Sequence, residues 1–414
     1  MIQVLGQLKR TWGTAILFGV CLFLQILYPF IAPPKLLSSA VSTRNLQAMT
    51  AGKSGYEIFG FAPYWNFDKL GGTDFNALTT LAYFDIPLTG SGDLNIYDPG
   101  YTSFWSDQAT SLFEKAHANG TRVVVTITQM NNLDITTMLS DSTAQQNAIS
   151  QIVDIVKKRG IDGVNIDIES VDDLGPYYRS MFSNFVGQVT TVMHKEVPYS
   201  QVSVSVLASS VKQPKLYDIA LLSKSSDEIF MMAYDFATTF SDNAMPTDPL
   251  YGYKQGQYWY DVSTAVSDFL TQMPANKLVL GLPWYGYNYP VYQPQVNAQT
   301  LTYYASSMPQ PYNIVSDTAS VNGNYITGWD PVGQNSWKAY YDSYSGTWRM
   351  IFYDDPKAMA IRYDFVKKMH LAGTGIWALG FDDGKQDIWR VIEDKFGIKL
   401  SDASVVNKTI STNL

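Results

Sequence analysis

The chain has 414 residues, of which 46% are hydrophobic, 14% aromatic and only 16% charged. This length and apolar content are ample for a buried core and exclude a disordered chain. The formal net charge of -8 repels phosphate backbones and argues against nucleic acid as a partner. Few charges and many aromatic side chains indicate a surface rich in Tyr, Trp, Ser, Thr and Asn, which suits sugars.

Cysteine and histidine give no sign of a metal or redox site. The only cysteine, Cys21, lies in the most apolar stretch of the chain, so we expect no disulfide and no thiolate ligands in the folded part. His117, His194 and His370 are far apart, without the spacing of metal ligands, and are interpreted as structural or surface residues. We therefore expect neither a metal nor a cofactor.

The first segment, residues 1–34, is predicted to direct export. Residues 12–32 form an uncharged apolar run whose length roughly matches a hydrocarbon core about 30 Å thick. Lys9 and Arg10 precede the run and keep its N-terminal end in the cytoplasm. The length of the run favours an uncleaved membrane anchor, but the small residues at 38–40 leave cleavage by a signal peptidase, and hence secretion, open.

The folded domain is expected to span residues 56–398, between a linker at 35–55 and a polar tail at 399–414. Within it, short apolar, β-branched or aromatic runs alternate with segments of helical period. Eight runs are predicted as strands: 58–63, 78–86, 122–128, 163–169, 201–208, 228–235, 277–283 and 375–381.

Helices between these strands have clear ends. One is predicted over 143–159 and ends at Gly160, one begins at Pro176, and one begins at Pro356 and ends at Gly373. Strands that alternate with helices are parallel, and eight such units imply closure into a (β/α)8 barrel, the TIM barrel. An open doubly wound sheet remains an alternative, although no Gly-x-Gly-x-x-Gly follows the first strand.

The interval between the seventh strand and the helix at Pro356 is too long for a simple connection. It is rich in Tyr, Asn, Gly, Ser and Trp, and hydrophobic residues alternate in 337–341 and 347–353. The pattern predicts a small α+β insertion over about 286–353 with antiparallel strands. It lies on the side of the barrel where active sites are built, so we expect it to form a wall of the cleft.

The fourth strand, 163–169, carries an unusual polar pattern. Because side chains alternate along a strand, its even positions, all apolar, face the helices, and its odd positions point into the barrel: Asn165, Asp167 and Glu169. Glu169 lies nearest the C-terminal rim. Buried carboxylates without partners cost on the order of several kcal/mol, so function explains the pattern better than a structural ion-pair network, which would need inward Arg or Lys.

Asp167 and Glu169 are two residues apart, so their Cα atoms are about 6.6 Å apart. Repulsion at this range raises one pKa, and a rim glutamic acid that stays protonated near neutral pH suits general-acid cleavage of a glycosidic bond. We therefore predict Glu169 as the proton donor. Since no second carboxylate is obvious as a direct nucleophile, the substrate itself is expected to supply one.

Residues 162–169, Asp-Gly-Val-Asn-Ile-Asp-Ile-Glu, resemble the Asp-Gly-x-Asp-x-Asp-x-Glu signature of glycoside hydrolase family 18, the chitinase family. Three later segments resemble further motifs of this family in the same order: 232–235 (Met-Ala-Tyr-Asp), 281–286 (Gly-Leu-Pro-Trp-Tyr-Gly) and 375–380 (Gly-Ile-Trp-Ala-Leu-Gly). The resemblance covers roughly the whole predicted barrel.

The resemblance implies retaining, substrate-assisted hydrolysis of β-linked N-acetylglucosamine glycans, namely chitin, chitooligosaccharides or peptidoglycan. Glu169 would protonate the leaving oxygen while the acetamido oxygen of the sugar attacks the anomeric carbon. Asp167 would hold the acetamido N–H, and Tyr234 would bond its carbonyl oxygen. The candidate substrate-binding residues are Trp377, Asp235, Met232, Asn165, Tyr285 and Trp65. Further aromatic candidates are Tyr64, Tyr83, Phe84, Trp284 and Tyr287.

Asn165 departs from the commoner family pattern, which has Asp at this position. The missing charge removes one repulsive partner of Asp167 and is expected to shift the pH optimum. Asn versions are familiar in the branch that resembles spore-cortex N-acetylglucosaminidases, which points to peptidoglycan as well as chitin, although the LysM repeats usual there are not visible. A non-catalytic lectin on the same barrel and a wall-associated structural protein are the alternatives.

Overall fold

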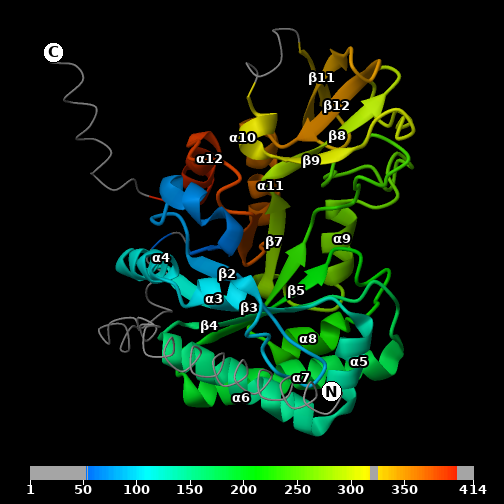
Figure 1. Cartoon of the computed structure of the whole chain (residues 1–414). Coiled ribbons are helices and arrows are strands. Elements are labelled where there is room, and N and C mark those ends of the chain that lie inside the picture. The colour runs from blue at the N-terminus through cyan, green and yellow to red at the C-terminus, as the bar shows by residue number, and fades with distance from the viewer. Residues whose placement is uncertain (1–52, 54, 318–324, 399–414) are drawn as a thin grey trace, which may run out of the picture. The chain divides into compact units, whose positions relative to one another are not determined.

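Eight parallel strands close into a barrel in the order β1-β13-β7-β6-β5-β4-β3-β2 (Figure 1). The structure, a computed structural model, describes residues 53, 55–317 and 325–398. The closed barrel confirms the predicted TIM fold and rules out the open sheet. The barrel strands are β1 (Glu57–Pro63), β2 (Thr80–Pro87), β3 (Arg122–Gln129), β4 (Gly163–Ile168), β5 (Gln201–Leu207), β6 (Glu228–Met232), β7 (Leu278–Pro283) and β13 (Gly373–Trp377).

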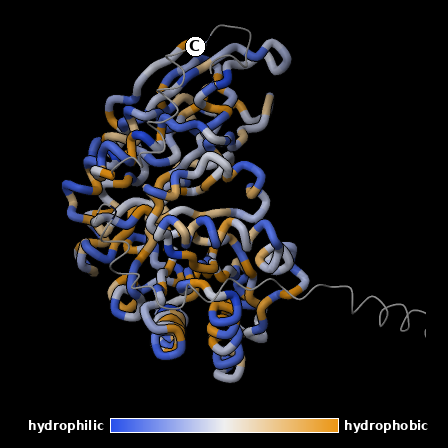
Figure 2. Tube along the Cα trace, turned by 90° about the vertical axis from the view of Figure 1, so that its left-hand side faces the viewer, coloured by the Kyte–Doolittle hydropathy of each residue, from blue (hydrophilic) through white to orange (hydrophobic). Residues whose placement is uncertain are grey.

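Helices surround the barrel, and most of them begin at a side-chain cap, α7 and α12 being exceptions. In α6, the Asp141 carboxylate accepts from the Thr143 N–H, and Gly160 ends the helix at a left-handed φ of 70°. Figure 2 shows hydrophobic residues on strands and inward helix sides, with hydrophilic residues outward. The helices are α3 (Pro99–Phe104), α4 (Asp107–Ala118), α5 (Asn132–Ser140), α6 (Ser142–Arg159), α7 (Gly175–Glu196), α8 (Ile219–Ser225), α9 (Val262–Phe269), α11 (Pro356–Lys368) and α12 (Asp387–Phe396), with 3-10 turns η3 (Tyr64–Gly72) and η4 (Ala275–Lys277).

Several predicted boundaries are wrong. The helix from Pro356 ends at Lys368, because the chain turns at His370, whose φ is 53°, before reaching Gly373. Gly373 instead begins β13, where a Cβ atom would lie 1.9 Å from the Glu57 carbonyl oxygen, so only glycine fits there. β4 and β6 also end earlier than predicted, which places Glu169 and the residues after Met232 in loops at the barrel mouth.

The predicted α+β insertion after β7 is confirmed as a five-stranded antiparallel sheet in the order β10-β11-β12-β8-β9. Strand β8 pairs with β12, so Tyr287 lies opposite Phe352. The sheet lies beyond the C-terminal end of β7 in Figure 1. Its elements are β8 (Tyr285–Val291), β9 (Met308–Pro311), α10 (Tyr312–Val315), β10 (Ile326–Asp330), β11 (Asn335–Asp342) and β12 (Thr347–Tyr353).

A buried ion cluster ties the insertion to the barrel. Arg362 of α11, fully buried, lies 2.5 Å from an oxygen of Asp248 and 2.7 Å from an oxygen of Asp354. Asn335 of β11 donates to both carboxylates, at 3.0 and 2.7 Å. Because buried charges are tolerated only when paired and hydrogen-bonded, this cluster fixes the segment after β6 against the insertion.

The core has two layers. Val164, Ile166 and Ile168 belong to the layer between barrel and helices, as their alternation predicts, while Asn165 and Asp167 point inside. The barrel interior is filled mainly by aromatic and aliphatic side chains: Phe59, Phe61, Ala82, Phe84, Val124, Phe230, Met232 and Val279. These residues close the barrel below its mouth, so the open space lies at the C-terminal end.

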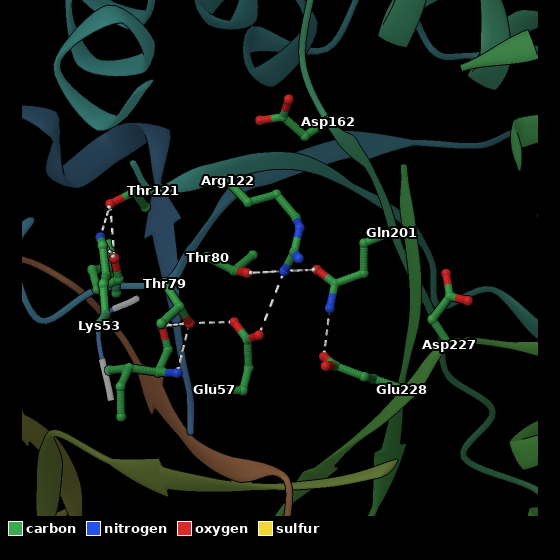
Figure 3. Close-up of polar contacts among 12 residues, drawn as sticks. Lys53, Glu57, Thr79, Thr80, Thr121, Arg122, Asp162, Gln201, Asp227 and Glu228 are labelled. Carbon is green, nitrogen blue, oxygen red and sulfur yellow. Dashed lines mark hydrogen bonds and ion pairs between the residues drawn. The ribbon is translucent and has the colours of Figure 1, made fainter. Parts of the chain in front are cut away.

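Polar side chains close the opposite end of the barrel (Figure 3). Arg122 donates to Thr80 and to Gln201, both at 2.9 Å, and lies 3.4 Å from Glu57. Gln201 donates to Glu228 at 2.6 Å. Each of the five is the first residue of its strand, so they form one ring at the N-terminal end. This network holds one cation, Arg122, and two carboxyl groups, those of Glu57 and Glu228.

The Glu228 carboxyl in this ring makes stability depend on pH. Burial, and then repulsion by Glu57, raise its pKa to about 8, although Arg122 opposes this. Because the folded chain keeps a proton that the unfolded chain loses above its ordinary pKa of 4.5, stability falls as pH rises toward 8. We expect Glu228→Gln to be more stable than the wild type at pH 8, by on the order of 4 kcal/mol, and similar near pH 4.5, measured by urea unfolding. A constant difference between these pH values would contradict this.

No helix within the described residues is long and apolar enough to cross a membrane. The predicted anchor at 12–32 and the polar tail at 399–414 lie outside the described residues, as does most of the predicted linker.

Candidate active site

A cavity of about 310 Å³ opens at the C-terminal mouth of the barrel. Its walls come from the ends of barrel strands and from the residues just after them, where TIM barrels carry their active sites. The lining residues are Phe61, Phe84, Met130, Asp167, Glu169, Leu207, Met232, Tyr234, Asp235 and Trp377. Seven of these residues were predicted from the sequence, and the fold brings them together: Asp167, Glu169, Tyr234, Asp235, Met232, Trp377 and the further aromatic candidate Phe84.

Two carboxyl groups of the cavity lie on one chain segment. Asp167 of β4 is only 4% exposed, and its Oδ1 has no hydrogen-bond partner among the described residues. Burial, followed by repulsion from Glu169 and Asp85, raises its pKa well above the ordinary value. The pKa of Glu169 is also raised, first by burial and then by repulsion from Asp235, with Lys215 opposing. A half-buried glutamic acid at the mouth is thus disposed to keep a proton.

Sequence reasoning missed Asp85 of β2. Its carboxylate accepts a 2.5 Å hydrogen bond from the Thr128 hydroxyl, and Thr128 lies beside Asp167 in the β3–β4 register. Asp85 is therefore an acidic neighbour of Asp167, in place of the one that an Asp at position 165 would provide. A polar residue inside the apolar run 80–87 was the available signal, but its partner on the neighbouring strand β3 depends on the register.

Asn165 does not reach the cavity. It is fully buried, its amide donates to Ser205 at 3.0 Å, and its oxygen accepts from Ser203 at 2.9 Å. The predicted substrate contact is therefore wrong for Asn165, because both ends of its amide are satisfied by β5.

Asp235 follows β6 in a left-handed conformation, with a φ of 56° that short polar side chains tolerate better than bulky ones. Its backbone N–H donates to the Thr247 hydroxyl at 3.0 Å. Its carboxylate accepts from the hydroxyls of Tyr285 and Tyr287, the latter at 2.8 Å. Burial raises the pKa of Asp235, and these hydroxyl donors oppose the rise.

Aromatic rings form the floor of the cavity. Trp377, half-buried, packs against Phe84 at 4.8 Å and Phe61 at 5.5 Å between ring centroids, in edge geometry. Tyr234 is nearly parallel to Trp377, with an interplanar angle of 25°. Trp65, 52% exposed, packs on Phe84 from outside the cavity. Trp377 is thereby held as a rigid platform, and Trp65 stands beside the site without lining it.

None of the described residues of the insertion lines the cavity, so the expectation of an insertion wall needs correction. Tyr285 and Tyr287 of β8 are each 7% exposed, and their hydroxyls are taken up by Asp235. The insertion therefore supports the site from behind Asp235. Of the other aromatic candidates, Tyr83 and Trp284 are fully buried in the outer core layer.

The fold and the cavity define a glycosidase of the TIM-barrel class. A protonatable glutamic acid stands at the mouth of the barrel beside other carboxyl groups and over an aromatic floor, the arrangement that cleavage of a glycosidic bond requires. The chain belongs to glycosyl hydrolases family 18, whose sequence model matches residues 57–382.

Known relatives agree with this assignment. The chain is 27% identical over 345 residues to a probable di-N-acetylchitobiase 1 of Dictyostelium discoideum, covering 77% of this chain and 80% of that protein. It is 21% identical to a cortical fragment-lytic enzyme of Bacillus subtilis, covering 70% and 63%. Among solved structures, a family 18 chitinase of Cycas revoluta in complex with (GlcNAc)3 has a TM-score of 0.70 at 16% identity, covering 83% of this chain and 100% of that one. That likeness shows the shared fold.

Proposed function

We propose that this glycosidase cleaves β-linked N-acetylglucosamine glycans by a retaining, substrate-assisted mechanism. The observation that carries the proposal is Asp167, which lines a sugar-sized cavity and whose buried Oδ1 has no hydrogen-bond partner among the described residues. An unpaired buried acceptor is costly unless a ligand supplies a donor. The acetamido N–H of N-acetylglucosamine is such a donor, and the chitobiase and chitinase relatives support this substrate class.

In this mechanism Glu169 protonates the leaving oxygen, while the acetamido oxygen attacks the anomeric carbon. The C–O bond to the leaving group breaks, and an oxazolinium ion forms on the sugar itself. Asp167 orients the acetamido group and stabilises its positive charge, and Tyr234 donates to its carbonyl oxygen. Glu169 then removes a proton from the water that opens the ring, which regenerates the acid. Asp235 is less suited to act as nucleophile, since hydroxyl donors occupy its Oδ1.

The test uses the full chain with chitin oligomers and, in parallel, purified peptidoglycan. We expect release of N-acetylglucosamine products whose first-formed anomer is β, seen by proton NMR, and competitive inhibition by a thiazoline that mimics the cyclised intermediate. Products of initially α configuration, or a covalent label from a nucleophile-trapping fluorosugar without thiazoline inhibition, would overturn the mechanism. The comparison of the two glycans decides between chitin and peptidoglycan.

We further propose that the protein is exported, and that residues 12–32 either anchor it to the membrane or are removed. The uncharged run after Lys9 and Arg10 supports this. Sequencing of the N-terminus of the mature protein from membrane and medium fractions tests it. A cytoplasmic protein with an intact N-terminus would contradict export.

A further inference from the structure

One face of β8 turns three tyrosines toward the barrel. Tyr285, Tyr287 and Tyr289 alternate along the strand, so they share a face, and they are 7%, 7% and 0% exposed. The first two hydroxyls donate to the same oxygen of Asp235, Oδ1. The Tyr289 hydroxyl is buried and has no hydrogen-bond partner among the described residues. The insertion thus reaches the reacting groups through two phenols, and the third offers a comparison on the same strand.

Thr247 adds a third hydroxyl to this oxygen. Its Oγ1 donates to Asp235 Oδ1 at 3.3 Å, and its carbonyl oxygen accepts from the N–H of Phe236 at 2.9 Å. Asp248, the next residue, is held by the buried Arg362. The loop that carries Thr247 is therefore fixed by the ion cluster. Three donors converging on one oxygen favour a carboxylate over a carboxylic acid, because hydrogen bonds to a charged acceptor are roughly twice as strong.

We propose that Tyr285 and Tyr287 are positioning residues that keep Asp235 ionised while its neighbour Glu169 carries the catalytic proton, so that the insertion sets the acid limb of the pH profile. This inference rests on the proposed function, because it assigns a role within that reaction. The phenols suit the role, since burial, first among several causes, raises the pKa of both above the ordinary value and keeps them protonated through the working pH range.

The sign of the effect follows from the protonation states of the pair. The active form has Glu169 protonated and Asp235 ionised. Removing a phenol destabilises ionised Asp235. Two inactive forms are then favoured over the active one: the pair in which both residues are protonated, at low pH, and the pair in which Asp235 carries the proton and Glu169 is ionised. The fully ionised pair at high pH loses the same hydrogen bond, so its balance with the active form is unchanged.

Other groups near the pair are unchanged in such a variant. The titratable or charged groups that face Glu169 or Asp235 from the surrounding segments are Asp167, Lys215, Tyr217, Tyr234, Tyr285, Tyr287 and Tyr289, with Asp85 acting on Asp167. When Tyr287 alone is replaced by Phe, every group in this list except Tyr287 itself keeps its covalent structure. A shift confined to the acid limb therefore reports on Asp235.

The experiment compares the pH dependence of kcat/KM for the full-length wild type, Tyr287→Phe, Tyr285→Phe, the double variant that combines these two replacements, and the matched control Tyr289→Phe, on a chitin oligomer. We expect the acid limb to move up by about one pH unit in Tyr287→Phe, further in the double variant, with the basic limb nearly fixed and the plateau lowered. Tyr289→Phe should keep the wild-type profile. Melting temperatures of all variants check that they fold.

Two outcomes separate the failure of this inference from the failure of the proposed function. If the wild type does not hydrolyse N-acetylglucosamine glycans, the proposed function is wrong. If the wild type is active but Tyr287→Phe and Tyr285→Phe, both folded, keep its acid limb or shift it no more than Tyr289→Phe does, the tyrosines serve packing alone and the inference is wrong.

Discussion

Replacement of Glu169 by Gln is expected to lower kcat/KM for a chitin oligomer by about 10³-fold and to leave the fold intact. General acid catalysis contributes roughly 10²- to 10⁴-fold, and an amide of the same shape cannot donate the proton. The wild type should also show a basic limb where Glu169 loses its proton, because its pKa is raised by burial and by Asp235. This limb should vanish in the residual activity of the variant.

An aryl glycoside of N-acetylglucosamine with an acidic phenol as leaving group sharpens this test. Its glycosidic bond needs little protonation, so Glu169→Gln should lose less activity on the aryl glycoside than on the oligomer for the first chemical step. Glu196→Gln is the control, because Glu196 is an exposed carboxylate on α7 paired with Lys157 at the surface. Equal losses on both substrates, or wild-type turnover in Glu169→Gln, would rule out Glu169 as the acid.

The barrel could be predicted because its evidence is local. Apolar runs of strand length alternate with helical periods, and phase alone separates Ile166, which packs against the helices, from Asp167, which points inside. The exact ends of the strands and helices were harder to predict from the sequence. β13 begins at Gly373 because the backbone of β1 passes so close that a Cβ atom would clash, and this is a tertiary constraint.

The residues missed at the site depend on contacts between strands. Asp85 acts on Asp167 from β2, and its partner Thr128 is set by the β2–β3–β4 register, which the sequence pattern leaves open. Asn165 was expected at the substrate because its side chain points inward, yet two serines of β5 satisfy it below the cavity. Arg122 is an inward cation that the sequence did not identify. Its partners, Gln201 and Glu57, begin other strands, and the sequence pattern does not show which strand ends meet. The sequence predicts which way a side chain on a strand points, but it does not predict how deep in the barrel the side chain lies or which groups it contacts.

Asp167→Asn is expected to lower the activity and to raise the stability of the fold. We expect kcat to fall on the order of 10²-fold, since the amide cannot stabilise positive charge on the acetamido group as a carboxylate does. The same side chain is costly to the fold, because Asp167 is 4% exposed, has an unpaired Oδ1 and faces Glu169 and Asp85. An Asn of the same shape removes the titrating group and its repulsion.

The pH dependence of stability tests that cost directly. The pKa of Asp167 is raised in the folded chain, so the native state binds a proton that the unfolded chain releases above a pKa near 4, and stability falls by up to about 1.4 kcal/mol per pH unit. Asp167→Asn lacks this dependence. We expect it to be about 2 kcal/mol more stable than the wild type at pH 7 and nearly equal near pH 4, by urea unfolding. Asp154→Asn, at an exposed ion pair on α6, is the control. A variant that is less stable at pH 7, or fully active, would show that Asp167 is retained for structure and not for catalysis.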